Sequence, residues 1–242
     1  MQIFYRLIFS IIILVFLSVL PSSATTPLDL STDDGLRDRM TSDGKKLIDQ
    51  IYKALSKLKD YKFESILYMC KPVPHESGAG TYFFKSPNLV RLQIKSHGIK
   101  NGTVVVRQPD GRIRIAGGPK LRFLKMNIEE DSRMLQAPNG YNVIKSDFAS
   151  LFAAVMSALG AGSKAQATTT PILLSRFKQN VTVLQLVKPD GGTEEITDRI
   201  FIDPQTNTPV EWDLFRNGSI YSITLFENFN ANIGLQDDQF KL

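Results

Sequence analysis

The stretch RIFIDPQTNTPVEWDLF at residues 199–215 decides the fold, together with NGS at 217–219 and IYSITLFENF at 220–229. Apolar residues alternate with polar ones on both sides of the Pro/Asn segment and of the Asn-Gly pair, which is typical of strands joined by tight turns. A final segment, NIGLQDDQF, follows at 232–240. The stretch therefore predicts a strand, a turn, a strand, an Asn-Gly turn and a further strand.

The same alternation continues upstream. Tyr61, Phe63, Ser65, Leu67 and Met69 share one face of a strand, and Val90, Leu92 and Ile94 share one face of another. Asn101-Gly102 and Asp110-Gly111 are turn signals between such runs, which indicates an antiparallel meander. The strands expected in total are ten or eleven, at about 61–69, 81–85, 90–95, 103–107, 112–116, 120–128, 171–179, 181–188, 195–203, 210–215 and 220–228.

Two segments have helical periodicity instead. Residues 44–59 carry an apolar stripe and a lysine-rich face, with Asp43 as the expected N-cap. Residues 148–159 follow Asp147 and end at Gly160; they are apolar almost all round, so this helix is expected to be buried or to lie against an apolar partner. Residues 161–170 are mostly small or polar, and we expect them to form a flexible loop.

This order predicts an α+β fold that is mainly antiparallel β. One strongly curved sheet with helices on its concave face accommodates the strands, whereas a closed barrel would need something to fill its lumen. No internal repeat and no linker divides residues 44–242, so they are expected to form a single domain with a sizeable core.

The N-terminus has the features of a secretory signal peptide. Arg6 precedes an apolar run at 7–20, and small residues Ser22 and Ala24 fit a signal-peptidase site, so we expect residues 1–24 to be removed after Ala24. The run is shorter than the roughly 20 residues that span a bilayer; an uncleaved membrane anchor is the alternative. Residues 25–43 are polar and are interpreted as a flexible leader.

Residues suited to covalent chemistry are scarce. Cys70 is the only cysteine and follows an apolar strand, so burial is expected and no internal disulfide can form. His75 and His97 have no spaced metal-binding partners, and acidic pairs such as Asp33-Asp34 are typical of solvated turns. No nucleophile, phosphate-loop or cofactor motif is present. The net charge of +5 is dispersed. We therefore expect no enzyme activity, no metal, no cofactor and no nucleic-acid partner.

Four short motifs resemble those of LolA-like proteins, the periplasmic lipoprotein carriers. They are IDPQTNTPV at 202–210, FEN at 226–228, DDQF at 237–240 and FKSPNLVR at 84–91. The resemblance implies an unclosed half-barrel, lidded by helices, around a hydrophobic cavity for acyl chains. In the carriers an arginine that helps to close the lid directly precedes the proline of the last motif. Here Ser86 takes that place, which puts the carrier type of lid closure in doubt.

The resemblance implies a monomeric periplasmic carrier, or chaperone, for lipoproteins or another lipid. Its partners would be an inner-membrane transporter and an outer-membrane receptor; the alternative is a non-catalytic envelope sensor or interaction module. The residues expected to line the cleft are Phe63, Leu67, Val90, Leu92, Ile94, Phe123, Trp212, Leu214 and Ile223. The residues expected in the lid are Leu47, Ile51, Leu55, Phe148, Leu151, Phe152 and Val155. Each could instead be ordinary core, and Trp212 a packing anchor.

Overall fold

The structure is a computed structural model that describes residues 36–41, 43–96, 99–121, 123–174, 176–190 and 192–242. The predicted signal peptide, its cleavage site and residues 25–35 of the predicted leader lie outside this range, as does His97. Within the described residues, no helix has the length and apolar character needed to cross a membrane.

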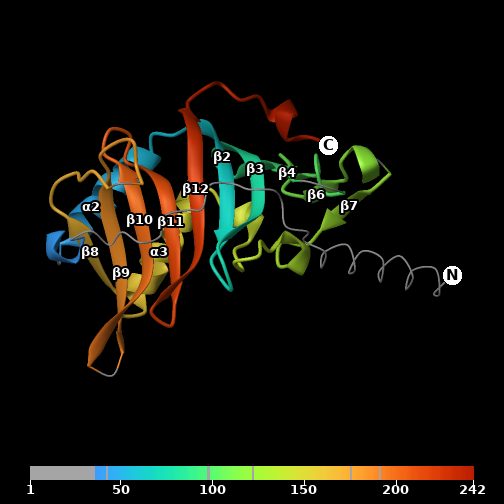
Figure 1. The fold of residues 1–242 in the computed structure, drawn as a ribbon. Coiled ribbons are helices and arrows are strands. Elements are labelled where there is room, and N and C mark those ends of the chain that lie inside the picture. The colour runs from blue at the N-terminus through green and yellow to red at the C-terminus, as the bar shows by residue number, and fades with distance from the viewer. Residues whose placement is uncertain (1–35, 42, 97–98, 122, 175, 191) are drawn as a thin grey trace.

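A single antiparallel sheet of twelve strands forms the body of the molecule (Figure 1). Its strand order is β1-β8-β9-β10-β11-β12-β2-β3-β4-β5-β6-β7, so β1 and β7 are its edges and the sheet is unclosed. In chain order the strands are β1 Met40–Thr41, β2 Asp60–Met69, β3 His75–Lys85, β4 Leu89–Lys95, β5 Val104–Arg107, β6 Ile113–Ala116, β7 Lys125–Ile128, β8 Lys164–Thr168, β9 Thr182–Asp190, β10 Thr193–Asp203, β11 Thr208–Arg216 and β12 Ser219–Ala231. The predicted α+β half-barrel is confirmed, with one strand more than the upper count.

Two α-helices, α2 (Gly44–Leu55) and α3 (Phe148–Gly160), pack on the same face of the sheet, which we call the concave face. α2 is four residues shorter than predicted, because the amides of Lys57 and Leu58 bond to carbonyls only three residues earlier, those of Ala54 and Leu55, and the chain then turns into β2. The side chain of Asp43 makes no capping hydrogen bond. Asp147 caps α3: its carboxylate accepts from the amide of Ser150 at 2.9 Å.

Three local predictions are wrong. Residues 164–168, within the expected flexible loop, form β8 against β9. Residues 171–179 are the expected strand; of these, residues 171–174 and 176–179 are irregular apart from a single bridge between Ile172 and Val181. Residues 119–121 are a 3-10 turn, η2 (Pro119–Leu121), so only β7 remains of the strand predicted at 120–128. The alternation of 171–179 is real, but β8 already occupies the edge of β9 that a further strand would need.

The end of the predicted leader belongs to the fold. Residues 37–39 form a 3-10 turn, η1 (Arg37–Arg39), and Met40 and Thr41 pair with Thr168 and Ala167 of β8. Leu36 is 1% exposed in a small cluster on the opposite, convex face of the sheet. Residues 36–41 are therefore structured, because they supply an edge strand and an apolar anchor that the polar character of the segment did not reveal.

Candidate functional site

An aromatic cluster fills the concave face between the sheet and α3. The ring of Phe148 stacks on Tyr61 and on Phe63 with centroid distances of 5.1 and 5.0 Å, and Phe63 stacks on Tyr82 at 5.0 Å. Phe226 of β12 meets Phe63 and Phe148 edge-on. Alternation along β2, β3 and β12 places these rings on one face, because residues paired directly across antiparallel strands point to the same side.

A cavity of about 100 Å³ remains beside this cluster. Apolar side chains make up most of its wall, and hydroxyl and amide groups make up the rest. Its lining residues are Phe63, Ser65, Leu67, Tyr82, Leu92, Ala137, Asn139, Tyr141, Val143, Ser146, Leu151, Trp212, Leu214, Thr224 and Phe226. Strands β2, β3, β4, β11 and β12 thus form the floor, and residues 137–151 form the roof.

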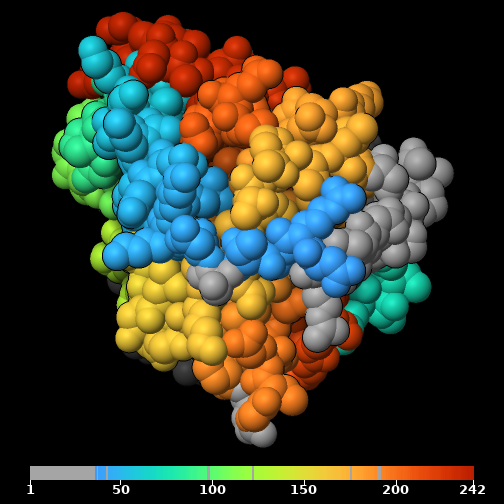
Figure 2. All heavy atoms as spheres, turned by 90° about the vertical axis from the view of Figure 1, so that its left-hand side faces the viewer, coloured from blue at the N-terminus to red at the C-terminus, as the bar shows by residue number. Residues whose placement is uncertain are grey.

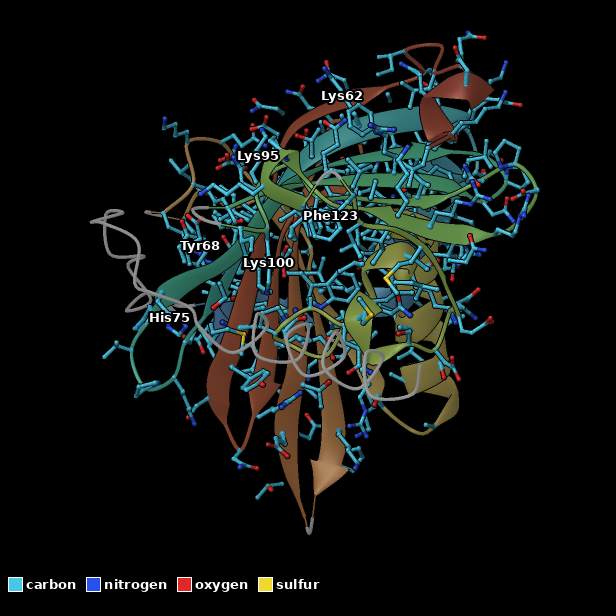
Figure 3. The ribbon with its side chains drawn as sticks, turned by 90° about the vertical axis from the view of Figure 1, so that its right-hand side faces the viewer. Lys62, Tyr68, His75, Lys95, Lys100 and Phe123 are labelled. Carbon is cyan, nitrogen blue, oxygen red and sulfur yellow. The ribbon has the colours of Figure 1, made fainter. Side chains whose placement is uncertain are left out.

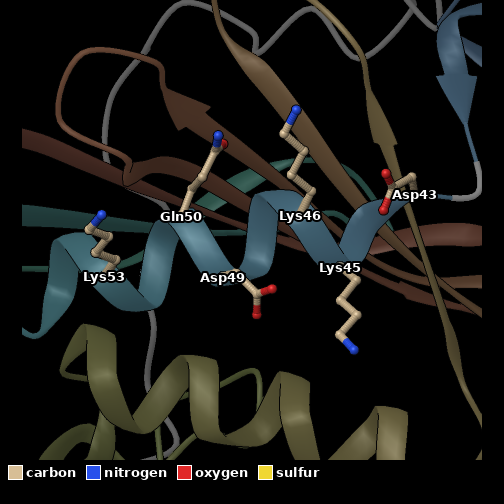
Figure 4. Close-up of a pocket in the computed structure, with 6 residues that line it drawn as sticks. All are labelled: Asp43, Lys45, Lys46, Asp49, Gln50 and Lys53. Carbon is tan, nitrogen blue, oxygen red and sulfur yellow. The ribbon is translucent and has the colours of Figure 1, made fainter.

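A larger hollow of about 480 Å³ lies on the solvent side of α2 (Figure 4). It is lined only by Asp43, Lys45, Lys46, Asp49, Gln50 and Lys53. Lys46, Gln50 and Lys53 point away from α3. A shallow surface bordered by hydrated charged side chains offers no enclosure, so the smaller concave cavity is the better candidate site.

Most of the residues predicted to line the cleft lie on the concave face. Phe63, Leu67, Leu92, Trp212 and Leu214 line the cavity. Val90 is buried in the same core, and Ile94 shares its face because it pairs with Gly80, which pairs with Ser65. Trp212 is also a packing anchor: it contacts Phe152, and its indole nitrogen donates to Asp198 at 3.0 Å.

Two predicted cleft residues are misplaced. Phe123 is 84% exposed in the turn between η2 and β7 (Figure 3), where no strand pairing fixes an inward side. Ile223 is buried, but it pairs with Asp213 and Tyr68 on the convex face. The residue of β12 that pairs with Trp212 on the concave face is Thr224. Because Thr224 is polar, a search for apolar residues selects its neighbour Ile223 instead.

The predicted lid residues cover the concave face. Phe148, Leu151, Phe152 and Val155 of α3 are all buried in the main core, as are Leu47 and Ile51 of α2; Leu55 packs at its edge. The two helices lie side by side on one face of the molecule (Figure 2) and are joined by a 3.2 Å hydrogen bond from Tyr52 Oη to the carbonyl of Phe152.

A third covering element was not predicted. Residues 129–147, which include η3 (Arg133–Leu135) and η4 (Val143–Lys145), cross the cleft ahead of α3 and bury Leu135 and Ile144. We call them the cover segment. The carboxylate of Glu130 ties the segment to the sheet through Arg107 of β5, at 3.1 Å, and also binds Lys145 at 2.8 Å. The pKa of Glu130 is lowered, chiefly by the hydrogen bond from Lys145.

Polar contacts within the concave core are few. The hydroxyl of Tyr61 accepts a hydrogen bond from the amide of Phe148 at 2.9 Å, at the first turn of α3. Burial raises the pKa of the Asp198 carboxyl, while its hydrogen bonds from Trp212 and Thr197 oppose that shift. Burial also raises the pKa of Tyr141, and the nearby charge of Asp198 adds to it.

The convex face carries a different kind of cover. Residues 171–174 and 176–181 pack their apolar side chains on Phe201 and Val183. Arg176 lies 4.4 Å from the Phe201 ring centroid and pairs with Glu211 at 2.6 Å and Asp213 at 3.1 Å. Burial raises the pKa of both carboxyls, and for Glu211 the charge of Asp213 raises it further. The alternation of residues along β11 could have predicted that Glu211 and Asp213 share one face. It could not have predicted that Arg176, from a distant segment, is their partner.

The described residues show little means for covalent catalysis. Cys70 is buried as predicted, and burial, with the charges of Asp213 and Glu211, raises the pKa of its thiol to about 11. At neutral pH it is therefore a thiol rather than the nucleophilic thiolate. Among the described residues no group of His, Cys, Asp and Glu side chains is arranged to hold a metal ion. The concave site is suited to burying hydrocarbon.

No protein-family model matches the sequence, and no curated protein matches it. Solved structures with a similar fold include a LolA superfamily protein from Nitrosomonas europaea, at 8% identity over 82% of this chain and 97% of that one, with a TM-score of 0.39. Lipoprotein LppX from Mycobacterium tuberculosis is 12% identical over 79% of this chain and 97% of its own, with a TM-score of 0.43. A chain of the Pseudomonas aeruginosa MucA/MucB complex is 17% identical over 83% of this chain and 61% of that one, with a TM-score of 0.47. These likenesses concern the fold alone.

Proposed function

We propose that this protein binds the acyl chains of lipoproteins or of another lipid between its concave face and α3, and carries them through the periplasm without covalent chemistry. The supporting observation is the apolar cleft of an unclosed sheet, covered by a helix and a segment that belong to neither edge of that sheet. Hydrocarbon binds such a surface because each buried methylene contributes about 0.8 kcal/mol.

The cavity is small compared with the ligand that we propose. Ligand sites for drug-sized molecules have volumes of roughly 300–1,000 Å³, whereas this cavity has about 100 Å³. A long acyl chain does not fit until the roof moves. On this proposal, binding requires displacement of α3, of the cover segment, or of both.

The forces that hold α3 permit such a displacement. Its buried side chains contribute about 1.5–3 kcal/mol each, but these contacts are not directional. An acyl chain inserted beneath the helix re-buries the same apolar surface on both sides, so the contacts are exchanged rather than lost. Sixteen carbons could gain on the order of 10 kcal/mol before ordering costs are subtracted.

The proposal is tested with a matched pair of variants on β4. Leu92 lines the cavity, whereas Gln93, the next residue, points to the convex face. Leu92→Glu should abolish the co-purification of lipid with protein isolated from its own envelope, as seen by native mass spectrometry, because a carboxylate would face the hydrocarbon. Gln93→Glu should retain it.

Folding of both variants is checked by circular dichroism and thermal unfolding. Lipid retained by a folded Leu92→Glu protein, or no lipid on the wild type under any extraction condition, would remove the basis of the proposal. A transfer assay then addresses the partners. The protein should extract a lipoprotein from inner-membrane vesicles that contain a transporter and ATP, and deliver it to a receptor of the outer membrane.

A further inference from the structure

Two hydrogen-bond donors on the concave face lack partners among the described residues: the hydroxyl of Tyr82 and Nε of Arg107. Tyr82 is 2% exposed and lines the cavity. A buried donor without an acceptor costs about 1–3 kcal/mol, so two of them in one region of a core require an explanation.

Strand pairing places the two donors near each other. Tyr82 of β3 pairs with Leu92 of β4, which pairs with Val105 of β5, and Arg107 follows two positions later on the same face. The pKa of Tyr82 reflects these neighbours: burial raises it most and the charge of Asp147 adds to the rise, whereas the positive charge of Arg107 and the backbone amide of Ser146 oppose it. The Ser146 amide is a donor, so the Tyr82 hydroxyl proton still lacks an acceptor.

The groups around Tyr82 and Arg107 indicate which kind of acceptor the two donors lack. Arg107 already binds one carboxylate, that of Glu130, through its terminal nitrogen. Glu130 is on the cover segment and its side chain is 43% exposed. The nearby carboxylate of Asp147 caps α3 through Ser150, so it also belongs to the cover. A displacement of the cover would carry both carboxylates away, and would leave the guanidinium of Arg107 and the hydroxyl proton of Tyr82 in need of another acceptor.

We propose that Tyr82 and Arg107 bind the anionic headgroup of the acyl ligand, and that this oxyanion replaces Glu130 when the cleft opens. The inference rests on the proposed function and narrows its ligand to a hydrocarbon chain that carries a carboxylate or a phosphate. An oxyanion has acceptors only, and charge-assisted hydrogen bonds from a guanidinium are among the strongest available to it. The apolar floor of the cavity then takes the chain.

The test compares three probes of equal chain length: dodecanoic acid, dodecyl phosphate and 1-dodecanol. Binding is followed through the fluorescence of Trp212, the only tryptophan, which lines the cavity. We expect the wild type to bind at least one of the two anions ten or more times more tightly than the alcohol. The anion that binds more tightly identifies a carboxylate or a phosphate as the headgroup.

Variants assign the preference to these residues. Arg107→Gln should weaken anion binding at least tenfold and leave 1-dodecanol nearly unchanged, Arg107→Lys should retain part of the preference, and Tyr82→Phe should weaken anion binding at least threefold. Arg114→Gln is the matched control, because Arg114 lies on the opposite face of the neighbouring strand and pairs with Asn127.

Equal affinity for the alcohol and both anions in the wild type, or an unchanged ratio in folded Arg107→Gln protein, would overturn the headgroup site while leaving hydrocarbon binding intact. If none of the three probes binds, the proposed function itself fails and the headgroup site with it. Circular dichroism and thermal unfolding of Arg107→Lys and Tyr82→Phe guard against a loss of binding caused by misfolding.

Discussion

The two faces of the sheet are covered in different ways. On the concave face, α3 is held mainly by stacked rings and aliphatic side chains, with single hydrogen bonds from Tyr52 and to Tyr61. On the convex face, residues 171–174 and 176–181 are held by Arg176, which pairs with two buried carboxylates and lies over an aromatic ring. Apolar contacts can be exchanged for contacts with a ligand, whereas a buried ion cluster has no such substitute. The comparison therefore favours α3, rather than the convex cover, as the element that moves in the proposed function.

The largest effect is expected from breaking the convex cluster. Arg176→Met removes the cation that pairs with the buried carboxyls of Glu211 and Asp213, which should lower the free energy of unfolding by about 3–5 kcal/mol. Urea unfolding at neutral pH measures it, and Lys178→Met, an exposed change in the same segment, is the control. The loss should shrink at acidic pH, where the carboxyls are protonated. A loss below 1 kcal/mol would show that the cluster does not fix this cover.

A comparable truncation on the concave face should also lower stability, but there a bound ligand should restore part of the loss. Phe152→Ala should cost about 3 kcal/mol in unfolding free energy, because it removes a fully buried ring. Saturating dodecanoic acid should raise the melting temperature of this variant by more than that of the wild type, since the chain fills the space. Dodecanoic acid should raise the melting temperature of Arg176→Met by no more than it raises that of the wild type. Equal shifts in all three proteins would contradict a distinction between the covers.

A smaller effect concerns pH. The folded pKa of Glu211 lies well above its ordinary value of 4.5, because of burial and of Asp213. A raised acid pKa contributes stability that is complete below pH 4.5 and is lost as the pH rises through the folded pKa. Glu211→Gln removes this titration, so its unfolding free energy should fall less steeply than that of the wild type above pH 4.5. The exposed change Glu129→Gln should keep the wild-type slope; a parallel slope for Glu211→Gln would refute the assignment.

The smallest effect tests the tie between the two concave helices. Tyr52→Phe removes one partly exposed hydrogen bond to Phe152 and should cost about 0.5 kcal/mol. Amide hydrogen exchange should accelerate in α3, while β9, β10 and β11 keep their protection. Tyr68→Phe, on the convex face, should leave α3 unchanged. Faster exchange in the strands would mean that the tie supports the whole fold rather than the cover.

Much of the fold follows from short-range patterns. Period-two alternation placed Phe63, Leu67 and Leu92 on one face, and the Asn-Gly and Asp-Gly turns predicted antiparallel neighbours. The helical stripe of α3 and its Asp147 cap were predictable because both depend on residues within one or two turns of each other. Errors arose where local alternation did not decide the structure, at Phe123 in the turn between η2 and β7 and at residues 171–174 and 176–179 beside an occupied sheet edge.

The sequence by itself determined antiparallel strands with an apolar inner face and two helices, because the direction of a side chain along a strand or helix is a property of the local backbone; that the sheet is unclosed was implied by the family resemblance. Only the tertiary structure decided that Ile223 faces outward, that Glu130 meets Arg107, and that Arg176 meets Glu211 and Asp213. Those contacts join segments 23 or more residues apart, such as Arg107 and Glu130. They depend on strand register and on how loops cross the sheet, which no local period encodes.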